Sequence, residues 1–124
     1  MNPKVIFVDD EQNVLDGLKR MLRDCREKWD MKFVTGGAEA LVVIARDGCD
    51  IVVTDYKMPG MNGMELLNTI MEKYPNMKRV FLTGQSDREV YNASSGTAHR
   101  YLDKPCDAET IKKTIEDLLK GEPS

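Results

Sequence analysis

The chain has 124 residues and a formal net charge of −3, with 41% hydrophobic and 31% charged residues, which fits one soluble globular domain. The acidic balance gives no support for direct nucleic-acid binding, which favours a basic patch, and no run approaches the ~20 apolar residues of a membrane span. The N-terminus lacks the long apolar stretch of a signal peptide, and the three scattered cysteines form neither a disulfide framework nor a metal motif, so we expect reduced thiols in a cytoplasmic protein.

Short apolar runs alternate with longer amphipathic segments along the chain. The runs that predict strands are residues 4–8, 31–35, 50–54, 79–83 and 98–102. Between them, apolar residues recur at steps of three and four, the spacing of one helix face, in segments from Val14 to Cys25, Ala38 to Ala45, Met64 to Met71 and Ile111 to Leu119. A weaker helical pattern covers residues 87–92. The last helix is predicted to begin after Asp107, a good N-cap, and to end at Gly121.

Five strands alternating with five helices predict parallel βαβ units, with helices on both faces of one sheet. The apolar runs at 5–8, 51–53 and 80–82 are continuous, as expected for strands that are covered on both sides. The strand at 31–35 ends in Thr35-Gly36-Gly37 without an evident chemical group, so we predict that it lies at an edge of the sheet. In open sheets of this kind, ligands bind beyond the carboxyl ends of the strands.

Side chains that chemistry can use stand at the ends of the other four predicted strands. Asp9 and Asp10 follow the first strand, Asp55 follows the third, Thr83 ends the fourth and Lys104 follows the fifth. Because the ends of parallel strands share one rim, this repetition predicts one site built from four strand ends. Each residue also has an ordinary interpretation, as an acid at a helix N-terminus, a turn residue or a solvated lysine. These ordinary interpretations do not explain why all four occur in chain order on matching strand ends.

The predicted cluster suits magnesium and phosphate chemistry. Three carboxylates at one rim repel one another, and a hard divalent cation removes the repulsion. Mg²⁺ prefers oxygen ligands, whereas Zn²⁺ favours His or Cys, and His99, the one histidine, is expected to be an ordinary solvent-facing imidazole away from the site. Lys104 and Thr83 offer contacts for phosphoryl oxygens. Asp55, alone at its strand end, is the best nucleophile for phosphorus.

Four motifs resemble the receiver (CheY-like) domain of bacterial two-component response regulators. They are Val8-Asp9-Asp10-Glu11, Thr54-Asp55-Tyr56-Lys57-Met58-Pro59-Gly60-Met61-Asn62-Gly63, Leu82-Thr83-Gly84 and Tyr101-Leu102-Asp103-Lys104-Pro105. The motif Asp-x-x-Met-Pro-x-x-x-Gly, together with three other elements in order, is highly specific. The resemblance implies a receiver domain at residues 1–120, with a tail or the start of a linker at 121–124. It also implies a flavodoxin-like, doubly wound (βα)5 fold whose five-stranded parallel sheet has the order 2-1-3-4-5.

The resemblance implies that Asp55 is the phosphoacceptor, which takes a phosphoryl group from a phosphohistidine. Asp10 would bind Mg²⁺ directly, and Asp9 would act largely through water. Asp55 and the backbone carbonyl of Lys57 would complete the protein ligands of the metal.

The remaining family positions imply a switch. Lys104 would contact the phosphoryl oxygens, and a cis peptide would precede Pro105. Thr83 would move towards the phosphoryl group, and Tyr101 would turn inward into the vacated space. This small event would bias a read-out face formed by helix 4, strand 5 and helix 5. Gln85 and Lys57 are expected to tune the lifetime of the phosphorylated state.

The implied partners are a sensor histidine kinase or phosphotransfer protein and an output domain or effector protein. The Leu-Thr-Gly and Tyr-Leu-Asp-Lys-Pro-Cys-Asp stretches resemble receivers joined to HD-type phosphohydrolase or related domains. A homodimer through the read-out face is a further expectation, whereas no contact with nucleic acid or membrane is expected. Beyond its own phosphorylation and autodephosphorylation, the domain is expected not to be an enzyme.

Two other functions compete with this interpretation. A haloacid-dehalogenase-type phosphatase also phosphorylates an aspartate, but that family requires a second aspartate two residues after the nucleophile, where this chain has Lys57. A receiver-like binding module that works without phosphorylation would retain the fold. Failure to bind Mg²⁺ at millimolar levels would favour the binding module.

Overall fold

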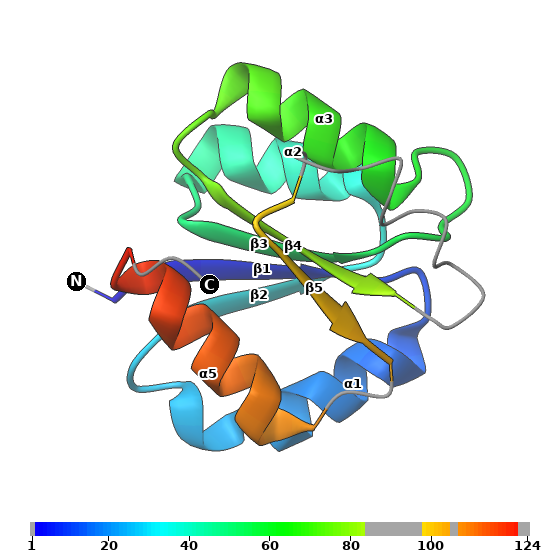
Figure 1. Ribbon diagram of the computed structural model, residues 1–124. Coiled ribbons are helices and arrows are strands. Elements are labelled where there is room, and N and C mark those ends of the chain that lie inside the picture. Colours follow the sequence, from blue (N-terminus) through cyan, green and yellow to red (C-terminus); the bar gives the residue numbers. More distant parts are fainter. Residues whose placement is uncertain (1, 84–97, 105–106, 122–124) are drawn as a thin grey trace.

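The computed structural model describes residues 2–83, 98–104 and 107–121. Its strands are β1 (Lys4–Val8), β2 (Asp30–Val34), β3 (Ile51–Asp55), β4 (Lys78–Thr83) and β5 (Arg100–Asp103). Its α-helices are α1 (Gln12–Met21), α2 (Gly37–Asp47), α3 (Gly63–Lys73) and α5 (Ala108–Leu119), and a short 3₁₀ helix, η1, covers Arg23–Cys25 (Figure 1). The helix predicted at residues 87–92 lies outside the described residues.

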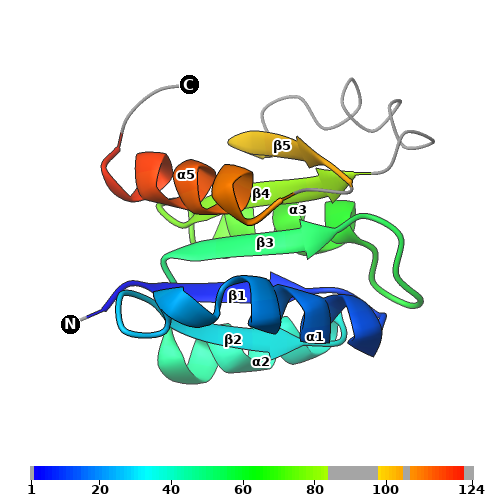
Figure 2. The same ribbon diagram turned by 90° about the horizontal axis from the view of Figure 1, so that it is seen from below.

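The sheet has the predicted topology. All five strands are parallel and hydrogen-bonded in the order β2-β1-β3-β4-β5. Helices α1 and α5 cover one face of the sheet, and α2 and α3 cover the other (Figures 1 and 2). The doubly wound α/β fold and the edge position of the second strand are therefore confirmed. The strand order reverses at β1 and β3, which places a ligand-binding crevice at their carboxyl ends.

Two apolar cores hold the layers together, because alternate residues of each strand face opposite sides of the sheet. The core under α1 and α5 includes Phe7, Leu15, Val53, Leu82 and Ile115. The core under α2 and α3 includes Ile6, Val52, Leu66, Ile70 and Phe81. The central strand β3 is buried along its whole length. Its packing therefore fixes the position of its last residue, Asp55, at the rim of the sheet.

The first helix is shorter than its sequence pattern predicted. The apolar spacing continues to Cys25, but α1 ends at Met21, where Leu22 adopts φ −105° and ψ 14°. The chain then tightens into η1, and the Cys25 N–H donates to the Leu22 carbonyl at 2.9 Å. Cys25 and Trp29 are still buried in the core under α1 and α5. The pattern therefore identified the buried side of this segment correctly but not the end of the helix.

Polar caps determine where α3 and α5 begin. The Asn62 side chain accepts a hydrogen bond from the Glu65 N–H at 2.9 Å, and the Glu65 carboxylate accepts one from the Asn62 N–H at 3.0 Å. This reciprocal pair is a capping box. The Asp107 side chain accepts a hydrogen bond from the Thr110 N–H at 2.8 Å, so the predicted N-cap of α5 is confirmed.

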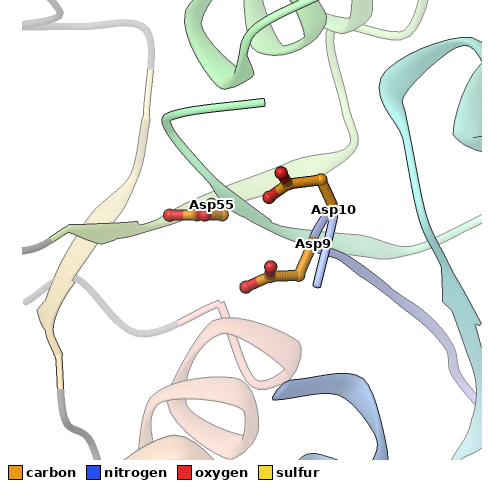
Figure 3. Close-up of side chains that lie close together, drawn as sticks. All are labelled: Asp9, Asp10 and Asp55. Atoms are coloured by element: carbon orange, nitrogen blue, oxygen red, sulfur yellow. The ribbon is translucent and has the colours of Figure 1, made fainter. Parts of the chain in front are cut away.

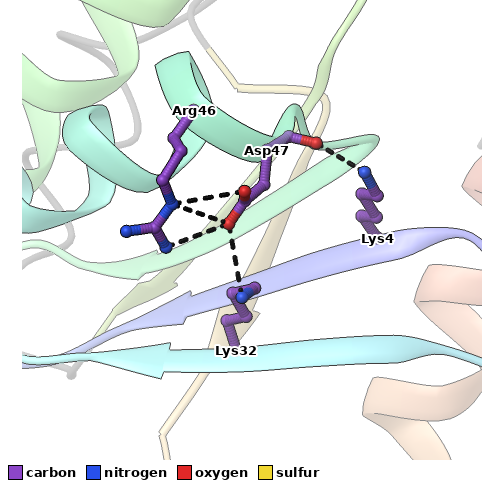
Figure 4. A network of polar contacts seen from close by, with 4 residues as sticks. All are labelled: Lys4, Lys32, Arg46 and Asp47. Carbon is purple, nitrogen blue, oxygen red and sulfur yellow. Dashed lines mark hydrogen bonds and ion pairs between the residues drawn. The ribbon is translucent and has the colours of Figure 1, made fainter.

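At the amino-terminal rim of the sheet, a polar network joins α2 to β1 and β2 (Figure 4). The Lys4 ammonium donates to the backbone carbonyl of Asp47. The Asp47 carboxylate pairs with Arg46 at 3.0 Å and with Lys32 at 3.4 Å. The hydrogen bond from Arg46 outweighs burial and lowers the pKa of the Asp47 carboxyl, with a smaller contribution from Lys32. Gly48, at φ 78°, then turns the chain towards β3.

We expect Asp107→Ala to lower the melting temperature by a few degrees at pH 7, because α5 loses its N-cap. The hydrogen bonds from Thr110 lower the pKa of Asp107 in the folded chain. A lowered folded pKa means that the carboxylate stabilises the fold above its unfolded pKa, and that this stabilisation is lost as the pH falls through the folded pKa. The difference in melting temperature between wild type and variant should therefore shrink below about pH 4, and a difference that stays constant would contradict the capping role.

Candidate functional site

Three carboxylates converge at the carboxyl-terminal rim of the sheet (Figure 3). Asp9 and Asp10 directly follow β1, and Asp55 ends β3; each offers one carboxylate oxygen that lies within 4.8 Å of those of the other two. Asp9 and Asp55 are buried, whereas Asp10 is exposed. The sequence predicted that these residues would meet, and the parallel pairing of β1 with β3 is what brings them together.

Lys104 adds a positive charge to this cluster. Its Nζ lies 2.9 Å from Asp55 Oδ1 and 3.3 Å from Asp9 Oδ2. Its backbone N–H donates to the carbonyl of Thr83 at 2.8 Å, so the pairing of β4 with β5 positions the lysine. A residue 95 positions after Asp9 in the chain is thereby held against two of the three carboxylates.

Burial and charge act in opposite directions in this site. Burial raises the pKa of Asp55, and the nearby Asp9 carboxylate adds to the rise, while the hydrogen bond and charge of Lys104 oppose it without cancelling it. For Lys104, burial disfavours the ammonium, but Asp55 and Asp9 together outweigh burial and raise its pKa. Lys104 therefore stays positively charged at neutral pH. The ionised form of Asp55 is less favourable than the ionised form of an exposed aspartate.

Hydrogen bonds distinguish the three acids from one another. Asp9 Oδ1 accepts from the Glu11 N–H at 2.9 Å while its Oδ2 faces Lys104, so both oxygens of Asp9 are engaged. Asp55 Oδ1 accepts from the Tyr56 N–H at 2.9 Å as well as from Lys104. Asp10 is the exposed acid and lines a cavity of about 370 Å³ together with Tyr56, Lys57, Met58, Pro59 and Asn62. Asp10 is therefore the most accessible of the three acids to a cation from solvent.

The loop after Asp55 is held close to the strand end by Gly63, the last residue of the motif that begins at Asp55. The Gly63 N–H donates to the Tyr56 carbonyl at 2.8 Å. A Cβ on Gly63 would lie 2.2 Å from the Asp55 carbonyl oxygen and 2.9 Å from Phe81 Cε1. Only glycine allows this approach, which gives a physical reason for the final glycine of the Asp-x-x-Met-Pro-x-x-x-Gly motif.

The predicted switch residues lie on the same face of the sheet. Thr83 is fully buried at the end of β4, and Tyr101 is a partly buried residue of β5 that packs against the core under α2 and α3. Tyr101 pairs in register with Phe81, two residues before Thr83. The predicted cis peptide at Pro105 and the predicted role of Gln85 concern residues outside those that the structure describes.

His99 differs from its predicted role as a solvent-facing side chain. It is partly buried. Its ring nitrogen Nδ1 accepts a hydrogen bond from the Arg79 backbone N–H at 3.0 Å, and the His99 backbone N–H donates to the Arg79 carbonyl at 2.7 Å. Burial, together with the charges of Arg79 and Lys78, lowers the pKa of His99. It precedes β5, at the rim opposite the acidic cluster, so the prediction that it lies away from the site was correct.

Fold and site together define a class of protein. A parallel α/β sheet of order 2-1-3-4-5 carries a carboxylate triad and a lysine at its switch point, with a buried aspartate at the end of the central strand. Hard oxygen donors beside a fixed ammonium suit Mg²⁺ and a phosphoryl group. These features are typical of a phosphoacceptor domain.

The sequence model of the response regulator receiver domain matches residues 5–116. The chain therefore belongs to the receiver domain family of two-component response regulators, whose members are generally Mg²⁺-dependent phosphoacceptor signalling modules that act with sensor kinases and output domains. Among the described residues, every helix is too short or too polar to cross a membrane.

Several relatives illustrate this membership. Chemotaxis protein CheY-3 of Vibrio cholerae is 30% identical over 121 residues, which cover 95% of this chain and 92% of that protein. The transcriptional regulatory protein YesN of Bacillus subtilis is also 30% identical, but the match spans 94% of this chain and only 32% of YesN. The receiver domain of an HD domain-containing protein from Pseudomonas fluorescens superposes with a TM-score of 0.89 at 27% identity, over 98% of this chain and 97% of that one.

Proposed function

We propose that this domain is a phosphorylation switch in which Asp55 accepts a phosphoryl group from a phosphohistidine of a sensor kinase or phosphotransfer protein. One observation carries the proposal. The Asp55 carboxylate, buried at the end of the central strand, lies 2.9 Å from the Lys104 ammonium and within 4.8 Å of two further carboxylates. A structural ion pair would not require a third acid, Asp10, beside the two that Lys104 contacts, whereas a site for metal and phosphate would.

In the proposed transfer, a carboxylate oxygen of Asp55 attacks phosphorus. The bond between phosphorus and the donor imidazole nitrogen breaks, that nitrogen keeps the electron pair and takes a proton from solvent, and an acyl phosphate forms on Asp55. Lys104 Nζ and the Tyr56 N–H both act on Oδ1, so we assign Oδ2 as the attacking oxygen. Lys104 and the Thr83 hydroxyl then contact the phosphoryl oxygens, which spreads the developing negative charge over fixed donors.

The acidic cluster fits Mg²⁺. Asp10 and Asp55, with the backbone carbonyl of Lys57, would hold the ion, and Asp9, whose two oxygens are already engaged, would act through water. A bound ion would offset the negative charge of these carboxylates and of a phosphoryl group at the rim.

The proposed read-out follows from where the switch residues lie. Thr83 moves towards the new phosphoryl group, and Tyr101 turns further inward beside it, which changes the face that includes β5 and α5. That face would control an output domain or effector, with an HD-type domain as the candidate suggested by the Pseudomonas fluorescens structure, or would form a homodimer. Hydrolysis of the acyl phosphate by the domain itself would reset the switch.

Lys104→Ala tests the proposed role of the ammonium. Wild type incubated with Mg²⁺ and acetyl phosphate should incorporate one hydroxylamine-labile phosphate, and the variant should incorporate it about 100-fold more slowly, because one fixed donor to the transferring group is lost. Lys113→Ala, which removes the same charge from an exposed position on α5, should match wild type. The Mg²⁺-induced rise in melting temperature should survive in both variants. Unchanged labelling of Lys104→Ala would reduce Lys104 to a structural ion-pair partner.

A further inference from the structure

Three aromatic rings form a row across the face of the sheet under α2 and α3. The Tyr56 ring meets the Phe81 ring edge-on, with 6.2 Å between centroids and 68° between planes. On the other side, Phe81 stacks with Tyr101 at 6.0 Å and 21°. Phe81 is fully buried, and both tyrosines pack against the same core. We call Tyr56, Phe81 and Tyr101 the aromatic row.

One end of the aromatic row is attached to the acidic site. Tyr56 directly follows Asp55, and its N–H donates to Asp55 Oδ1 at 2.9 Å. The Tyr56 carbonyl accepts the Gly63 N–H, and the Phe81 ring edge lies 2.9 Å from where a Cβ of Gly63 would stand. Phe81 therefore contacts the loop after Asp55 at two points, the Tyr56 ring and the backbone at Gly63.

The other end of the row is the outermost strand. Tyr101 lies on β5, an edge strand in the order β2-β1-β3-β4-β5, and pairs in register with Phe81. It is only partly buried, whereas Phe81 is fully buried. The fully buried Phe81 therefore lies between a residue whose N–H donates to the Asp55 carboxylate and a residue of the edge strand.

We propose that Phe81 is a positioning residue that couples the state of Asp55 to the side chain of Tyr101 through direct ring contacts. This inference rests on the proposed function. Phosphorylation on Oδ2 moves the negative charge to the phosphoryl group and leaves Oδ1 as the neutral carbonyl oxygen of an acyl phosphate, so Oδ1 holds the Tyr56 N–H and Lys104 less strongly. Tyr56 then shifts, and Phe81 passes the shift to Tyr101, because a close-packed core has no free space to absorb it. This route works beside the proposed movement of Thr83 and does not need it.

The test measures the response of Tyr101 directly. The full chain, labelled with ¹⁵N, is titrated with beryllofluoride and Mg²⁺, and the change in the Tyr101 amide shift is compared between the free and bound states of each variant. In Phe81→Leu, the affinity for beryllofluoride should stay within about twofold of wild type, while the Tyr101 response falls at least about fivefold. Tyr56→Leu should reduce the same response, and Tyr56→Phe, which keeps the ring, should retain it.

Phe7→Leu is the matched control for lost packing. Phe7 is equally buried and stacks with Phe33 at 5.0 Å, but on the opposite face of the sheet, so its truncation should leave the Tyr101 response intact.

A wild-type chain that does not respond to beryllofluoride would refute the proposed function itself. A normal wild-type response that persists in Phe81→Leu would overturn only the coupling role. Should Phe81→Leu not fold, Tyr56→Leu decides, and an undiminished response there also overturns the coupling role.

Discussion

Asp55→Asn should abolish phosphate incorporation, with a loss of more than about 1,000-fold in initial rate, while the fold stays intact. The substitution keeps the shape of the side chain and an oxygen that can accept the Tyr56 N–H, which the carboxylate now binds at 2.9 Å. It removes the charged nucleophile, and an amide does not attack phosphorus at neutral pH. Labelling by acetyl phosphate with Mg²⁺, followed by release with hydroxylamine, measures the loss.

Asp50→Asn is the matched control for this result. Asp50 is an exposed acid just before β3, at the opposite end of the strand from Asp55, and it accepts the Lys4 N–H at 2.8 Å. The same chemical change at this position should leave labelling at the wild-type rate. Full incorporation in Asp55→Asn would move the acceptor to another residue and refute the proposed mechanism, whatever the fate of the control.

Gly63→Ala should produce the largest loss of stability among alanine substitutions of the glycines that the structure describes. The new Cβ would lie 2.2 Å from the Asp55 carbonyl oxygen and 3.0 Å from the Tyr56 Cα, and backbone atoms cannot move aside as a flexible side chain can. We expect the free energy of unfolding to fall by about 3 kcal/mol, equivalent to a drop in melting temperature of about 10 °C. Urea denaturation followed by circular dichroism measures the change.

The control for added bulk is Gly17→Ala, in the middle of α1. A Cβ built there meets no atom within 4 Å, and alanine favours a helix interior over glycine. This variant should therefore gain about 0.5–1 kcal/mol. If Gly63→Ala were as stable as wild type, the close approach of the loop to the end of β3 would be wrong, and the position of Asp55 would need another explanation.

Much of this site could be predicted from sequence because it depends on local patterns. A continuous apolar run such as 51–53 predicts a buried strand, and an acid directly after it must stand at the rim. Parallel pairing then brings Asp9, Asp10 and Asp55 within 4.8 Å without any knowledge of loop structure. The motif resemblance supplied the strand order, which local patterns alone do not determine.

The features that sequence reasoning missed are contacts whose partners are set by register and loop path. The stacking of Phe81 on Tyr101 depends on how β4 pairs with β5, and the hydrogen bond that His99 accepts from Arg79 depends on the same pairing. The end of α1 at Met21 was missed because apolar spacing stays nearly the same when an α-helix tightens into a 3₁₀ turn. The Asn62 and Glu65 capping box, by contrast, has a readable spacing.

The two rims of the sheet differ in whether a label or tag can be attached without disturbing the proposed site. The proposed chemistry occupies the carboxyl-terminal rim, whereas the opposite rim holds the salt-bridged Asp47 and the turn at Gly48. A fluorophore or affinity tag attached near that turn would stand the full length of a strand away from the acceptor carboxylate. The domain can therefore be immobilised or labelled from that end for single-molecule work, with the rim that carries Asp55 left uncovered.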